Sequence, residues 1–149
     1  MAQGDLTVFE EFAIQLGTET HTLTSDTLKL GIIDNTSPPA ADDSTPRWSS
    51  YSANEVSDAG GYVSGGITLT GVSFNEADGV AVLAASNVSL AQNASGFTDG
   101  YWGIIYNDSN AIDSAIAFVE LGGPASEQAG PININWNASG ILTISVSNL

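Results

Sequence analysis

The 149-residue chain has the length of a single domain, which we expect to span residues 1–149. Lys29 and Arg47 are its only basic side chains against 17 acidic ones, so the formal net charge is −15. So few cations predict that neither nucleic acid nor an anionic membrane is a partner, since both are bound by clusters of Lys or Arg. With no cysteine and one histidine, the sequence also predicts no disulfide, no thiolate chemistry and no multi-histidine metal centre, and we expect no cofactor.

An apolar pattern near the N-terminus predicts one short helix within an N-terminal arm of residues 1–25. Four apolar residues recur at the spacing of a single helix face, namely Phe9, Phe12, Ala13 and Leu16. Thr7 is the expected N-cap, with Glu10 completing a capping box, and Gly17 is the expected end of the helix.

After the helix, residues 27–32 show the two-residue period of a half-buried strand, whose inward-facing residues are Leu28, Leu30 and Ile32. Residues 34–50 follow as a long segment that is too rich in proline and polar residues for a strand, and we interpret it as an extended surface loop or arm. Loops of this length in compact domains usually carry a function. Residues 48–56 then have the apolar spacing of a short helical turn.

Six further segments are expected to be strands separated by turns: residues 67–74, 80–90, 101–107, 115–121, 132–136 and 141–146. The last two alternate on both sides of a four-residue turn that ends in Gly140, which predicts a hairpin. Seven strands at this spacing predict a mainly β fold. We expect an antiparallel β-sandwich of jelly-roll-like topology, with one short N-terminal helix and a long extended loop.

No group of residues has the spacing of an active site, and we predict that the protein is not an enzyme and has no catalytic residues. Adjacent acids such as Asp42 and Asp43 lack the separation across a cleft that acid–base catalysis by two carboxylates needs. His21 is expected at the surface or at a helix cap rather than as a general base, because no nucleophile motif accompanies it.

Two acidic loops, residues 75–79 and 108–113, offer the oxygen ligands that Ca²⁺ prefers, but neither has the spacing of an EF-hand. We therefore interpret their Asp and Asn residues as turn formers and predict no metal site. Trp48, Trp102 and Trp136 are compatible with a sugar-stacking surface, although packing in a core or an interface is the commoner use of tryptophan.

Several stretches of the chain together resemble small virion proteins of tailed bacteriophages. The resemblance lies in D-T-L-K-L-G-I-I-D-N-T-S-P at 26–38, E-V-S-D-A-G-G-Y-V-S-G-G at 55–66, G-Y-W-G-I-I-Y-N-D at 100–108, F-V-E-L-G-G at 118–123 and I-N-I-N-W-N-A-S-G-I-L at 132–142. Those virion proteins that have a role resemble head decoration, or cement, proteins. That family consists of β-sandwich or jelly-roll modules that oligomerise on the outer capsid surface, and it has no catalytic residues to carry over.

The resemblance implies a structural virion protein that binds the outer surface of a phage head and stabilises contacts between capsomers. Its partners would be the major capsid protein and further copies of itself, in a homodimer or homotrimer. We expect synthesis in the host cytoplasm, because the N-terminal residues do not form a secretion signal. The expected contact residues lie in the helix and the loop, with Arg47 pairing to an acid of the partner: Phe9, Phe12, Leu16, Pro38, Pro39, Arg47 and Trp48.

Three other functions stay open at this point. The first is a structural role elsewhere in the virion, at the neck or tail. The second is a secreted carbohydrate-binding β module that uses Trp48, Trp102 or Trp136 as its platform. The third is a hydrolase that uses acids from the loops.

Overall fold

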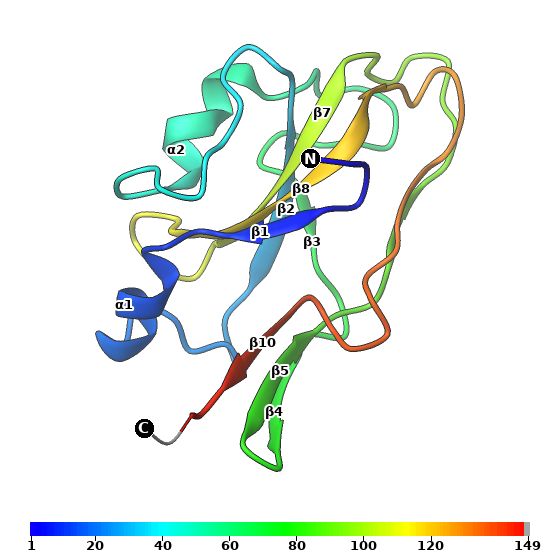
Figure 1. Ribbon diagram of the computed structural model, residues 1–149. Helices are drawn as coiled ribbons and strands as arrows, with labels where there is room; N and C mark the ends of the chain where they lie inside the picture. The colour runs from blue at the N-terminus through cyan, green and yellow to red at the C-terminus, as the bar shows by residue number, and fades with distance from the viewer. Residues whose placement is uncertain (148–149) are drawn as a thin grey trace.

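The computed structural model describes residues 1–147, which form a mainly β fold of three antiparallel sheets and two short helices (Figure 1). The largest sheet has five strands, in the order β1 (Leu6–Val8), β8 (Ala115–Ala125), β7 (Gly100–Asn107), β2 (Leu28–Ile33) and β3 (Ile67–Thr68). A second sheet has the order β10 (Leu142–Ser145), β5 (Val80–Ala84) and β4 (Ser73–Ala77). The third sheet pairs β6 (Val88–Leu90) with β9 (Ile132–Ile134).

The helices are short and lie outside the sheets: α1 (Phe12–Gly17), α2 (Trp48–Tyr51) and a 3-10 turn, η1 (Ser52–Asn54). The helical turn predicted for residues 48–56 is therefore confirmed. Within the described residues no helix is long and apolar enough to cross a membrane.

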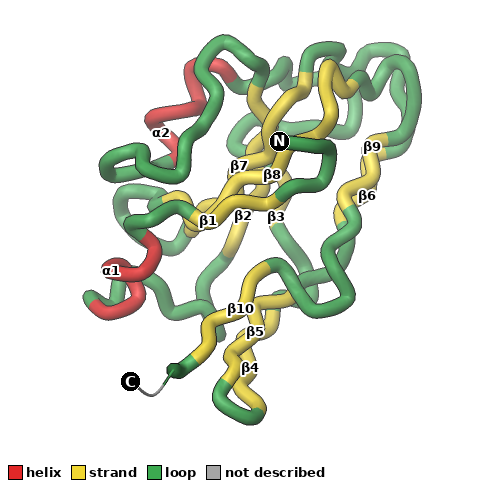
Figure 2. The backbone as a smooth tube through the Cα atoms, in the orientation of Figure 1, coloured by secondary structure: helices red, strands yellow, loops and turns green. Residues whose placement is uncertain are grey.

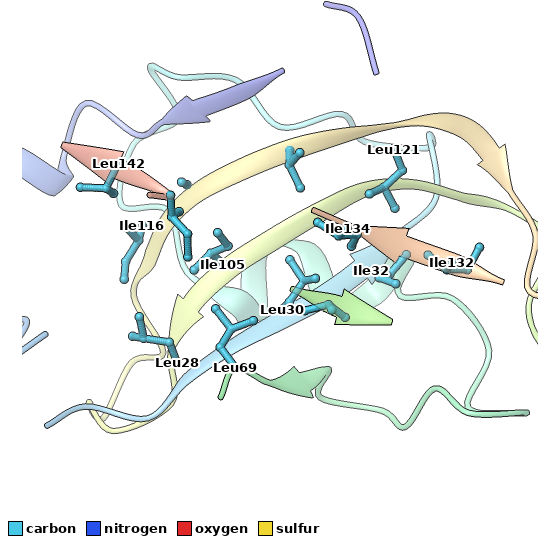
Figure 3. Close-up of a cluster of buried hydrophobic side chains, with 14 of the residues drawn as sticks. Leu28, Leu30, Ile32, Leu69, Ile105, Ile116, Leu121, Ile132, Ile134 and Leu142 are labelled. Atoms are coloured by element: carbon cyan, nitrogen blue, oxygen red, sulfur yellow. The ribbon is translucent and has the colours of Figure 1, made fainter. Parts of the chain in front are cut away.

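The main core lies between the five-stranded sheet and the two smaller sheets, as the β-sandwich prediction requires. β2 supplies Leu28, Leu30 and Ile32 to this core, all at most 1 % exposed, which confirms that these alternate residues face inward. The strand is not half-buried as predicted, because Gly31 and Ile33 on its other face are buried as well. Ile132 and Ile134 approach from β9 on the opposite side (Figure 3). The β-sandwich is thus held by apolar burial between layers, while jelly-roll connectivity stays a prediction.

The other face of the five-stranded sheet is covered as well, by α2 and by the loop that precedes it (Figure 1). Trp48 lies flat on Tyr106 of β7, with ring centroids 5.1 Å apart and planes 2° apart. Its ring also lies against the backbone of Gly31, where a Cβ atom would come 2.2 Å from Trp48 Cη2. Glycine at this strand position therefore makes room for the tryptophan.

The N-terminal helix is shorter than predicted, and its expected capping box is wrong. Residues Leu6–Val8 form β1, in which Thr7 lies opposite Phe118 of β8 and therefore cannot cap a helix. The helix begins at Phe12 and ends at Gly17, as predicted for its end. Phe9 precedes the helix, and its N–H donates to Ile116 O of β8. The backbone up to Phe9 is therefore hydrogen-bonded to β8 and is not available for a helical turn.

The C-terminal hairpin predicted for residues 132–136 and 141–146 is also wrong. β9 pairs with β6 and β10 pairs with β5, so the two segments belong to different sheets. Ile141 N–H donates to Leu83 O (2.7 Å), which directs the chain onto β5 at once. Two predicted strands, 67–74 and 80–90, are each divided in two, and β1 is an additional strand, which together account for ten strands where seven were expected.

We predict that replacing Gly31 with alanine destabilises the protein by about 1–3 kcal/mol, the usual cost of over-packing a filled core. The added Cβ would displace the Trp48 ring from Tyr106. Urea unfolding followed by circular dichroism measures the change. Gly17→Ala is the matched control, because a Cβ there meets nothing within 4 Å. Equal stability of the two variants would contradict the packing described here.

Candidate binding groove

A groove of about 510 Å³ opens between the β1–β8 edge of the large sheet and strand β9. Figure 2 shows β9 and β6 as a pair set apart from β1 and β8. The apolar part of the lining comes from both sides, namely Leu6, Val119 and Leu121 on one side and Ile132, Ile134 and Ile141 on the other. The groove is therefore an opening in the same sandwich layers that form the core.

Strand β9 presents an unpaired backbone edge to this groove. Ile132 and Ile134 lie opposite Leu90 and Val88 of β6, and the N–H of Trp136 donates to Asn87 Oδ1 (3.0 Å) on that side, from which we infer that the backbone groups of Ile132 and Ile134 also point to β6. Because backbone groups of successive strand residues point to opposite sides, the N–H and C=O groups of Asn133 and Asn135 face away from β6. Asn133 lies between two groove residues and lines it itself.

The opposite wall has a similar open edge, on β1. Asp5 O accepts a hydrogen bond from Glu120 N–H (3.1 Å), and Phe9 N–H donates to Ile116 O (3.0 Å), so the odd-numbered residues from Asp5 to Phe9 point to β8; before them, Gly4 N–H also donates to Glu120 O (2.8 Å). Leu6 therefore directs its N–H and C=O away from β8. Leu6 also lines the groove. The groove is thus bounded by two strand edges with free backbone hydrogen-bonding groups.

Trp136 is fixed in the groove wall by hydrogen bonds rather than held loosely. Its indole Nε1–H donates to Ser86 O (3.0 Å), and its side chain is partly buried against the main core. The polar residues beside it carry neutral amides: Gln3, Asn133, Asn135 and Asn137. Glu120 is the titratable residue among those that line the groove. The lining therefore combines apolar surface, amides and free backbone groups, and it contains no cation.

The sequence did not predict this groove, because it appears only when β9 and β10 separate. Of the groove residues, the sequence marks Trp136 as a sugar-stacking candidate and Gly140 as the end of a predicted hairpin turn. The signal that was present is the polar alternation Asn133, Asn135 and Asn137, which places amides along one side of an edge strand.

The predicted contact residues do not form one exposed surface. Phe9, Phe12 and Trp48 are 1 %, 4 % and 7 % exposed, so their side chains belong to the core, and the expectation that they are accessible to a partner is wrong. Phe9 packs on Phe118 at a centroid distance of 5.1 Å, on the opposite face of the large sheet from Phe12. Their burial follows from the sheet having two covered faces.

The other four predicted contact residues are divided between the surface and the core. Pro39 is buried, Leu16 is half-buried against the main core, and Pro38 is exposed. Arg47 is half-buried, and its Nε donates to Thr45 O (3.4 Å). The loop of residues 34–50 is thus fastened to the sheet rather than free as an arm, and only parts of it are open to a partner.

His21 is buried, which corrects its expected place at the surface. Its Nδ1 accepts from the amide of Asn107 (3.0 Å), and its Nε2 donates to Gln15 Oε1 (2.8 Å). The same Asn107 amide donates to Asp26 Oδ2 (2.6 Å). Both ring nitrogens are occupied by neutral amides, so His21 ties α1 to the end of β7 and has no nitrogen left to act as a base. Burial lowers the pKa of His21 from its ordinary 6.5, and the charge of Asp26 opposes this shift.

The acidic loops make hydrogen bonds typical of turns. Asn110 Oδ1 accepts from the N–H groups of Ile112 and Ser114, and Asp108 forms an ion pair with Lys29 (3.1 Å). In the other loop Glu76 accepts from Gly79 N–H (2.7 Å). Residues 1–147 contain no group of three or more His, Asp or Glu residues placed to hold a metal ion.

We find no protein-family model, curated protein or solved structure that matches the chain.

We predict that the stability of the protein decreases between about pH 7.5 and pH 5.5 because of His21. The unfolded chain takes up a proton near pH 6.5, whereas the buried ring of the native protein resists it, so protonation favours unfolding. The contribution is present above the unfolded-state pKa and is lost as the pH falls towards the lowered native pKa. Urea midpoints at both pH values measure it, with His21→Gln as the comparison. A variant with the same pH dependence as the native chain would contradict the assignment.

Proposed function

We propose that this protein is a structural virion protein that binds the outer surface of a phage capsid and stabilises contacts between capsomers. The observation that supports this most is the groove between β1 and β9, because its two open strand edges and apolar lining suit a segment of another protein. The sequence resemblance to decoration proteins supports the same function. The proposal includes a location on the outside of the head, a jelly-roll relationship to that family and a non-enzymatic role.

The charge of the chain limits how its copies can be arranged. Each copy carries −15, and one of its two cations, Lys29, is already paired with Asp108. Dimers or trimers crowded side by side on a head therefore repel one another, and dense decoration needs a less acidic platform between or beneath them. The major capsid protein would be that platform, and a dimer or trimer of this chain would bind across a symmetry axis.

A carbohydrate-binding β module is the second candidate, because Trp136 and four amide side chains line the same groove. Amides exchange hydrogen bonds with sugar hydroxyls, and an indole face can stack on a sugar ring. A structural role at the neck or tail of the virion would use the same surfaces as the capsid role.

Size-exclusion chromatography with light scattering tests the proposal on the purified chain, alone and mixed with empty heads of the phage that encodes it. We predict a dimer or trimer that co-elutes with heads at near-stoichiometric occupancy. A monomer that does not bind heads would contradict the proposal, and binding to isolated tails instead would indicate the neck or tail role.

We also predict that the occupancy of heads depends on ionic strength. Raising NaCl from about 0.01 M to about 0.15 M shortens the Debye length from about 30 Å to about 8 Å and screens the repulsion between bound copies. Occupancy at a fixed protein concentration should therefore rise over this range. An occupancy that is indifferent to salt would show that charge does not limit the arrangement.

A further inference from the structure

We infer that the groove takes one extended segment of the partner protein, which adds to the open edge of β9 as a further strand. This inference rests on the proposed capsid-binding function and specifies how the partner is recognised. It identifies the partner segment by its chemistry: an extended stretch of alternating apolar and polar residues, neutral or basic in charge.

The backbone groups of β9 supply the first reason. By the alternation inferred above, Asn133 and Asn135 direct their N–H and C=O groups away from β6, and β9 pairs with no other strand among the described residues. A row of such groups, repeating every second residue, matches the hydrogen-bonding pattern of another strand. The edge is short and carries polar side chains, so it is accessible without forming a long apolar edge prone to aggregation.

The side chains around this edge supply the second reason. Ile132 and Ile134 point inward as buried core residues, and their edges line the groove together with those of buried Val119 and Leu121 and of half-buried Leu6. A strand added beside β9 would direct every second residue onto this apolar surface and the others outward beside the amides. Apolar residues at alternate positions of the partner segment would therefore be buried on binding.

The negative charge of this chain favours a segment from a different protein over a segment from a second copy of this chain. The groove lining contains no Lys or Arg and one carboxylate residue, Glu120, within a chain of net charge −15. A segment from another copy would carry the same excess of acid, and like charges disfavour association. A neutral or basic segment is attracted by the field of the whole molecule.

A glycan fits the same groove less well than a strand does. The indole N–H of Trp136 is already used in its hydrogen bond to Ser86 O, so the ring could offer a sugar only its exposed face. The repeated backbone groups of Asn133 and Asn135 have the spacing of a peptide and not of sugar hydroxyls. Glycan binding is therefore the outcome of the test that would replace this inference.

Proline substitution tests the strand edge directly, because proline removes an N–H group and places a ring on that side of the strand. Asn133→Pro does this on the side of β9 that faces the groove. Ser89→Pro is the matched control: Ser89 lies opposite Asn133 in the β6–β9 pair, and its backbone points to the outer side of β6. Both variants lose the same side-chain hydrogen bond, from Ser89 Oγ to Asn133 Oδ1 (2.8 Å).

The readout is the binding of each variant to empty heads, after circular dichroism has shown that both fold. We expect Asn133→Pro to weaken binding by about tenfold or more, the effect of losing a backbone hydrogen bond and obstructing the edge, while Ser89→Pro binds like the native chain. Hydrogen–deuterium exchange on the native chain is the second measurement and needs no variant to fold. Residues 131–136 should exchange rapidly in the free protein and be protected on heads.

Each result bears differently on the two proposals. If the native chain binds heads but residues 131–136 gain no protection and Asn133→Pro binds normally, the groove inference is wrong and the capsid function stands. If the native chain does not bind heads, the capsid function and the groove inference fail together. In that case a glycan array with native chain and Trp136→Ala decides whether the groove binds sugar.

Discussion

The structure depends on a five-stranded sheet that is packed on both faces. Leu30 and Ile32 of β2 face the smaller sheets, while Gly31 between them leaves room for Trp48 on the other face. Apolar burial on two sides gives a chain of 149 residues a large core without disulfides or metals. It also buries Phe9, Phe12 and Trp48, whereas Ile14 of α1 stays 62 % exposed.

Two carboxylates, from half-buried Glu55 and fully buried Glu127, fix the glycine-rich segment of residues 60–66 to this framework. Glu55 accepts from the hydroxyl of Tyr62 and from Gly65 N–H, both at 2.7 Å. Glu127, fully buried, accepts from Gly61 N–H (2.7 Å). Glycine is needed at position 61 because a Cβ there would lie 2.9 Å from a Glu127 oxygen. In a chain with two cations, these acids accept hydrogen bonds from N–H and O–H donors instead of forming ion pairs, although Glu127 Oε2 is buried without a hydrogen-bond partner.

The local sequence pattern was enough to predict those elements whose structure depends mainly on neighbouring residues. The alternation of β2, the helical turn at Trp48 and the end of α1 at Gly17 were all predictable from neighbouring residues. The local pattern gave the wrong element where pairing with a strand distant in the sequence determined the structure. Phe9 has helical spacing from Phe12, yet β8 takes the preceding residues as β1.

The candidate site was missed for the same reason. The Asn137–Gly140 turn has the form of a hairpin, and a bridge between these two residues does form. However, Ser86 and Asn87 bind Trp136 while Leu83 binds Ile141, so the strands on either side of the turn diverge. This divergence opens the groove between β9 and the β1–β8 edge.

A cryo-electron microscopy map of heads decorated with this protein tests most directly whether the groove binds the capsid protein. The account predicts an extended segment of capsid protein lying in the groove and paired with the Asn133–Asn135 edge of β9. Density that places the β9 edge in solvent, with the capsid contacts on another surface, would contradict it.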